Sequence, residues 1–129
     1  DGVHLPADEI LLLRVIAHTA AWAQGEDWRQ AVLAYLQGNR DLLGQTLATQ
    51  LPQVGHLPPQ RTYLAWLDCR GLALSPSPQA FFLRKASVAM TGGADCGDGG
   101  QGHVRFNFGL PRPLLRQALA QMAEAVAAG

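Results

Sequence analysis

The sequence predicts an α+β fold, a two-layer small domain in which a short, mainly antiparallel sheet is covered on one face by helices. Three observations lead to this class. Three short segments have the composition or the alternation of strands, helical segments lie between and after them, and 48% of the 129 residues are hydrophobic. No internal repeat or linker divides the chain, so we expect residues 1–129 to form a single domain.

Two helices are expected in the first part of the chain. The first spans residues 7–24, opens at Pro6 and stops at Gly25, and its apolar residues cover nearly its whole circumference. A helix of this kind requires burial on all sides, which a small domain would struggle to provide. The second runs from Asp27, the expected N-cap, to about Leu51, with apolar residues at spacings of three and four.

The strands and the remaining helices follow a Pro/Gly connector. We expect strands at 62–68, 87–90 and 103–108, a short helix at 79–85, and a last helix that begins at Pro111 and Pro113. Between residues 92 and 102 there are six glycines, which predict a segment too flexible for regular structure and long enough to be a functional loop.

Charge and cysteine content exclude several classes of protein. Ten Lys and Arg balance ten Asp and Glu, and the cations are scattered, so we expect no nucleic-acid and no membrane partner. No apolar run approaches the ~18 residues of a membrane span. Cys69 and Cys96 form neither a disulfide framework nor a CxxC pair, which favours free thiols and a cytoplasmic location. Because the chain starts at Asp1 without an initiator Met, we expect a processed chain or a piece of a longer one.

Arg105 is the main candidate site residue. Alternation along a strand places Arg105 and Asn107 on one face and Val104, Phe106 and Phe108 on the other. A guanidinium fork beside a glycine-rich loop suits bidentate binding of a carboxylate or a phosphate. The alternative is an arginine on a solvated strand face that pairs with a surface acid.

Other kinds of site are disfavoured. The glycine-rich segment lacks the GK[ST] ending of a P-loop and precedes a strand instead of opening a helix. The Asp, Cys and His residues between 95 and 103 match no zinc or calcium spacing, so no metal site is expected. Lys85, the only lysine, stands at a predicted helix end, where the helix dipole favours a cation. We therefore expect no catalytic and no cofactor-binding residue in this chain.

Four motifs together resemble a known family. Residues 20–28 (AAW-x-x-G-x-x-W), 35–40 (YL-x-x-NR), 62–68 (TYLAWLD) and 102–112 (G-x-VR-x-NFG-x-PR) occur in that order. They resemble the C-terminal part of fold-type I pyridoxal-phosphate enzymes, nearest to the aminotransferases and cystathionine β-lyases of the MalY/PatB type. The resemblance extends over roughly residues 20 to 126.

The resemblance implies a role for Arg105, namely binding the α-carboxylate of an amino-acid substrate. In the family, pyridoxal 5′-phosphate sits on a larger N-terminal domain that supplies the Schiff-base lysine. The resemblance therefore implies the C-terminal small domain of an aminotransferase or C–S β-lyase, without the catalytic large domain. We expect such a chain to bind no cofactor alone, to be inactive alone, and to form a homo-oligomer because of its apolar first helix. The alternative is a free-standing small-acid-binding or protein-interaction module that retains the fold.

Overall fold

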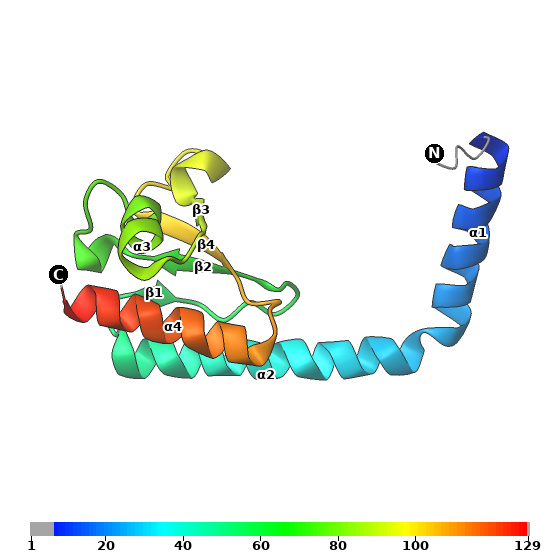
Figure 1. The fold of residues 1–129 in the computed structure, drawn as a ribbon, viewed down its shortest axis with the longest axis horizontal. Coiled ribbons are helices and arrows are strands. Elements are labelled where there is room, and N and C mark those ends of the chain that lie inside the picture. Colours follow the sequence, from blue (N-terminus) through cyan, green and yellow to red (C-terminus); the bar gives the residue numbers. More distant parts are fainter. Residues whose placement is uncertain (1–6, 129) are drawn as a thin grey trace. The chain divides into compact units, whose positions relative to one another are not determined.

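The computed structural model describes residues 7–128, with side chains from residue 9 onward. Pro6, His4 and the chain start at Asp1 lie outside the described residues. The helices are α1 (Ala7–Gln24), α2 (Glu26–Gln50), α3 (Pro78–Ala86) and α4 (Arg112–Ala127) (Figure 1). The strands are β1 (Gly55–His56), β2 (Leu64–Asp68), β3 (Thr91–Gly92) and β4 (His103–Asn107), and two 3₁₀ turns are η1 (Arg70–Leu72) and η2 (Gly93–Cys96). Contacts divide the chain into two units, residues 1–35 and 36–129, which are described separately.

The second unit contains an open antiparallel sheet with the strand order β1-β2-β4-β3. The central pair, β2 and β4, is aligned so that Leu64 lies opposite Asn107 and Asp68 lies opposite His103. Among the described residues the sheet has four strands, whereas the sequence predicted three. The additional strand, β1, has only two residues and lies inside the predicted connector, where so short a segment shows no alternation.

The core lies on one face of the sheet. Ala65 and Leu67 of β2 and Val104 and Phe106 of β4 are buried. The helices add buried side chains to the same cluster: Leu43 and Leu47 from α2, Phe82 and Ala86 from α3, and Leu115, Leu119 and Met122 from α4. Burial of this apolar surface is the main stabilising term of the unit. The predicted class, a small sheet with helices on one face, is confirmed (Figure 1).

The predicted strand at residues 87–90 is wrong. Ser77 caps α3 by accepting a hydrogen bond from the Ala80 N–H on its Oγ, at 3.3 Å. At the other end of this helix Ser87 adopts a left-handed conformation, with φ of 55°, and its N–H bonds to the carbonyl of Phe82. The chain therefore turns where a strand was expected, and the strand β3 follows at Thr91–Gly92.

The predicted N-cap of the second helix, Asp27, is also wrong. The helix begins at Glu26, so Asp27 lies within its first turn. The carbonyl of Gly25 accepts a hydrogen bond from the Arg29 N–H at 2.9 Å, and the Gly25 N–H bonds to the Ala21 carbonyl at 2.9 Å. Helical hydrogen bonding thus continues through the junction, and the N–H that an Asp27 cap would bind is already used.

The glycine-rich segment at 92–102 is more regular than the sequence predicted. Gly92 pairs with Val104 in the sheet, and residues 93–96 form the 3₁₀ turn η2. At the end of the segment Gly102 has a φ of +75°, and its carbonyl accepts a hydrogen bond from Cys69 N–H at 2.9 Å. The segment is therefore a structured connection between β3 and β4. No helix among the described residues is both long enough and apolar enough to cross a membrane.

Candidate functional site

Arg105 lies in the middle of β4, the strand between β2 and β3. Its cross-strand neighbours are Trp66 on β2 and Thr91 on β3. The alternation predicted from the sequence is confirmed, because Arg105 is exposed while Val104 and Phe106 are buried on the opposite face. Arg105 therefore stands on the sheet face that the helical core leaves uncovered within this unit.

The Arg105 guanidinium has one hydrogen bond among the described residues. Its Nη2 donates to Thr91 Oγ1 at 3.3 Å, and no acidic side chain of residues 9–128 forms an ion pair with it. The carboxylate of Asp68 lies on the same face as Arg105, but it is already bonded to Arg70. Asp68 accepts from Arg70 Nε at 2.8 Å and from Arg70 Nη2 at 2.7 Å, and these bonds hold the Asp68 pKa well below its usual range.

An aromatic pair stands beside Arg105. The rings of Trp66 and His103 are stacked, with centroids 5.4 Å apart and an interplanar angle of 18°. The Nδ1 of His103 lies 3.0 Å from the Gln101 carbonyl oxygen, within hydrogen-bond distance, and its Nε2 lies 3.7 Å from Asp68 Oδ1, which is an ion pair only when the ring is protonated. The sequence reasoning did not pair these rings: alternation along β4 places His103 on the face of Arg105, whereas Trp66 reaches that face through the β2–β4 register.

The end of β4 is fixed by two asparagines. Asn107 shares the face of Arg105, as predicted, but its Oδ1 accepts the Gly109 N–H at 2.8 Å and so closes a local turn. Asn39 of α2 is fully buried and donates through Nδ2 to the carbonyls of Phe108 at 3.0 Å and Leu110 at 2.8 Å. Its Oδ1 accepts from Arg112 Nε at 3.0 Å. The sequence reasoning missed Asn39, which stands four residues before Leu43 in the buried stripe of α2.

The cysteines and His56 do not add a functional group to the sheet face around Arg105. Cys69 is buried, and burial raises the pKa of its thiol to about 12, whereas Cys96 is exposed. Burial lowers the pKa of His56, and the ring lies close to the backbone of Trp66. Within residues 9–128 no group of three or more His, Cys, Asp or Glu side chains could hold a metal ion.

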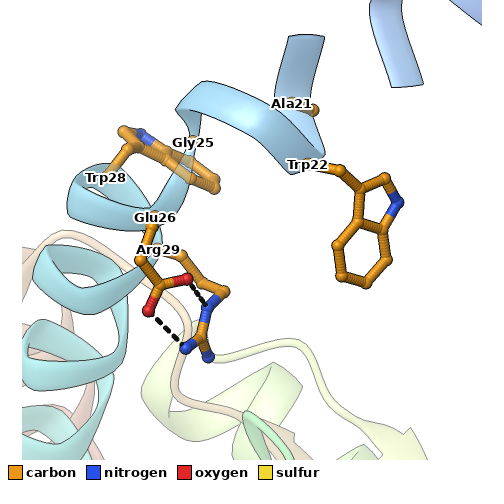
Figure 2. A pocket seen from close by; sticks show the side chains of 6 residues that line it. All are labelled: Ala21, Trp22, Gly25, Glu26, Trp28 and Arg29. Carbon is orange, nitrogen blue, oxygen red and sulfur yellow. Dashed lines mark hydrogen bonds and ion pairs between the residues drawn. The ribbon is translucent and has the colours of Figure 1, made fainter. Parts of the chain in front are cut away.

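A shallow apolar hollow of about 230 Å³ lies in the first unit, at the junction of α1 and α2. Trp22 and Trp28 border it, 87% and 71% exposed, and Figure 2 shows that they lie on different sides of the junction. The polar group at the hollow is already used, because Glu26 accepts from Arg29 Nε at 2.8 Å and Nη2 at 2.7 Å. This hollow therefore offers apolar surface without a free polar group to orient a ligand.

Comparison with known proteins supports a relationship to a group of lyases. No family model matches the sequence. Protein MalY of Escherichia coli is 34% identical over 129 residues, which cover 99% of this chain and 32% of MalY. Cystathionine beta-lyase PatB of Bacillus subtilis is 32% identical over 113 residues, and a Mycobacterium leprae relative is 40% identical over 127 residues.

A solved structure shows that the similarity extends to the fold. The PLP-bound C-S lyase from Staphylococcus hominis superposes with a TM-score of 0.82 at 32% identity, covering 88% of this chain and 30% of the lyase. The chain is a homologue of the C-terminal small domain of fold-type I, MalY/PatB-type enzymes. The resemblance predicted from the four motifs is thus confirmed. This MalY/PatB homologue spans about a third of the length of the curated relatives that it matches.

The residues of this MalY/PatB homologue do not by themselves fit pyridoxal phosphate. The resemblance implies a Schiff-base lysine for the cofactor, and Lys85 is the one lysine in the sequence. Lys85 is exposed in the last turn of α3 and lines neither the hollow at the α1–α2 junction nor a second hollow between residues 87–89, which follow α3, and the first half of α4. A lysine that is exposed and lines neither of these hollows is not placed to hold an aromatic aldehyde inside one of them.

Proposed function

We propose that the chain contributes a substrate-binding arginine, Arg105, to a pyridoxal-phosphate-dependent C–S lyase or aminotransferase that acts on amino acids. In this proposal Arg105 binds the α-carboxylate of the substrate, and the chain alone has no lyase or transaminase activity. The relatives support the reaction class, since MalY/PatB homologues include cystathionine beta-lyases and PLP-bound C-S lyases. The cofactor chemistry comes from residues outside this chain, because Lys85 offers no fit for the cofactor.

The observation that carries the proposal is the state of the Arg105 guanidinium. Asp68, a carboxylate on the same sheet face, is engaged by Arg70 through both oxygens. The alternative interpretation, in which Arg105 pairs with a surface acid, is therefore not supported by the contacts of residues 9–128. A guanidinium whose donors face outward from the middle of a strand can receive a carboxylate through two parallel N–H···O bonds.

The surroundings of Arg105 favour a fixed orientation of that carboxylate. The Arg105 side chain is bonded to Thr91 Oγ1, and its backbone is held between two antiparallel neighbours, β2 and β3. The contact with Thr91 and the strand pairing limit the rotamers that Arg105 samples, which lowers the entropy cost of ordering the side chain when an acid binds. The contribution of this chain is thus to bind and orient the acid end of an amino acid.

The proposal is tested by titrating the ¹⁵N-labelled chain with L-alanine and with pyruvate and following amide shifts in β3 and β4. We expect Arg105→Ala to weaken binding of both ligands about tenfold, which corresponds to ~1.4 kcal/mol and is near the value of one charged hydrogen bond. Arg105→Lys keeps the positive charge without the guanidinium fork, so its affinity for both ligands should lie between those of the wild type and Arg105→Ala. Arg116→Ala, an exposed arginine on α4, is the matched control. Equal affinities of the Arg105→Ala variant and the wild type would overturn the proposal.

A further inference from the structure

One of the two cross-strand neighbours of Arg105 is an indole, that of Trp66. Trp66 lies directly opposite Arg105 in the β2–β4 register, so the two side chains project from the same face. Opposed residues of an antiparallel pair have Cβ atoms about 4.5–5.5 Å apart, which is well within the reach of an indole and a guanidinium. A ligand that binds Arg105 must therefore extend past, or over, Trp66.

Trp66 is held in place by a chain of contacts. Its ring is stacked on His103, whose Nδ1 lies 3.0 Å from the Gln101 carbonyl oxygen and whose Nε2 lies 3.7 Å from Asp68 Oδ1. Asp68 in turn is fixed by the two bonds from Arg70. The stack covers part of the indole, yet 42% of Trp66 remains exposed. The exposed part is a preformed apolar surface, because its orientation is set before any ligand arrives.

We propose that Trp66 is a specificity-determining residue that selects acids with an extended apolar side chain. This inference rests on the proposed function, since it places the acid on Arg105 and the rest of the ligand on the exposed indole. The substrate class is then monocarboxylic amino acids whose side chain carries several methylene or thioether groups, which an aromatic ring contacts favourably. His103 is a positioning residue, because it acts by fixing the indole.

The size of the effect follows from the area that the ligand can bury. A fully buried methylene tightens binding about fourfold, and a chain resting on one exposed ring surface buries about half of each methylene. Each added methylene should therefore tighten binding about twofold. Over the four methylenes that separate acetate from hexanoate the gain is roughly 15-fold. Such a dependence on chain length is absent if the acid contacts Arg105 alone.

The test titrates the ¹⁵N-labelled full chain with acetate, butanoate and hexanoate, and follows the amides of β2 to β4 and the indole N–H signals. In the wild type we expect the roughly 15-fold gain from acetate to hexanoate, with a shift of the Trp66 indole signal. In Trp66→Ala the affinity for acetate should stay within about twofold, while hexanoate should fall to the level of acetate. A preference for hexanoate that survives in Trp66→Ala would overturn the inference.

A pair of substitutions at His103 gives an independent readout. His103→Ala removes the stacked ring and should lower the affinity for hexanoate more than that for acetate. His103→Phe restores a stacked ring without the contact to Asp68 and should recover the preference for hexanoate, which a general loss of fold could not produce. This pair also carries the test if Trp66→Ala is unfolded. Identical length dependence in wild type, His103→Ala and His103→Phe would count against His103 as a positioning residue.

Two controls separate this inference from the proposed function and from nonspecific binding. Trp22→Ala removes an indole from the other unit and should leave the whole series unchanged. Arg105→Ala should weaken all three acids by the same factor. If Arg105→Ala has no effect, the proposed function fails. If Arg105→Ala acts as expected and Trp66→Ala lowers all acids equally, the proposed function stands and the indole surface is not the selective element.

Discussion

At the scale of single residues, Asn39 connects α2 to the segment that follows β4. Its side chain is fully buried and makes three hydrogen bonds, to the carbonyls of Phe108 and Leu110 and from the guanidinium of Arg112. A buried polar group is tolerated only when it is bonded, and removal of one partner leaves the others unsatisfied. Because Phe108 is three residues beyond Arg105, Asn39 also fixes the end of the strand that carries the candidate site.

Substitution of Asn39 by Ala should lower the free energy of unfolding by about 3 kcal/mol. The reason is that two buried carbonyls and one guanidinium N–H would lose their partner while a small cavity forms. Urea unfolding of the full chain, followed by circular dichroism, measures the change. Gln37→Ala, an exposed amide on the same helix, should change stability by no more than about 0.5 kcal/mol. An Asn39→Ala variant as stable as Gln37→Ala would contradict the role of this network.

The positions of single residues could be predicted from the sequence where they depend only on the geometry of one strand or helix. The exposed position of Arg105 follows from alternation along a single strand. The stack of Trp66 on His103 depends on the register between β2 and β4, which alternation within each strand does not specify. The role of Asn39 could not be predicted either, since its partners lie 69 and 71 residues further along the chain.

At the scale of elements, the longer segments were predicted best. The first helix matches residues 7–24, and the strands at 62–68 and 103–108 contain β2 and β4. Long periodic segments carry a repeated signal, whereas β1 and β3 have two residues each and are defined by their pairing with neighbours. The error at 87–90 arose from a short, mostly apolar run, which resembles a buried strand in sequence, although only Val88 of these residues is buried.

The start of α2 gives a prediction about pH. Hydrogen bonds from Arg29 and Gln30 lower the pKa of Glu26 from 4.5 to about 2. Because the pKa of the folded state is lowered, the stabilising contribution of Glu26 is complete above about pH 4.5, and it is lost as the pH falls toward 2. A ¹³C NMR titration should show the Glu26 carboxyl titrating near pH 2.

The role of Arg29 in this shift can be isolated with a matched pair of variants. Arg29→Ala should move the midpoint of Glu26 upward, toward 4.5, because it removes the largest cause of the shift. Arg40→Ala removes an arginine that pairs with Asp41 and should leave Glu26 unchanged. The shift should also shrink at high salt, since Glu26 is exposed and the pair is screened. A Glu26 midpoint that is the same in both variants would show that Arg29 does not cause it.

At the scale of the whole molecule, the apolar residues are divided unevenly. The second unit has one buried core and only scattered exposed apolar side chains, whereas α1 exposes a continuous series of them: Ile10, Leu11, Leu12, Leu13, Val15, Ile16 and Trp22. The apolar circumference of residues 7–24 already predicted from the sequence that this helix would lack burial on all sides. The MalY/PatB relatives are about three times as long as the chain, so much of their surface has no counterpart here. Exposed apolar surface of this extent favours association.

The full chain should therefore self-associate in a way that depends on α1. Sedimentation velocity over a wide concentration range should show an average mass that rises with concentration. The double variant Leu12→Gln/Ile16→Gln should require about tenfold higher concentration for the same degree of association, because it removes apolar surface while glutamine remains a good helix former. Leu83→Gln/Leu114→Gln changes two comparably exposed leucines outside α1 and should leave the association unchanged. If the wild type sediments as a monomer throughout, or if both double variants shift the association equally, α1 is not the surface through which the chains associate.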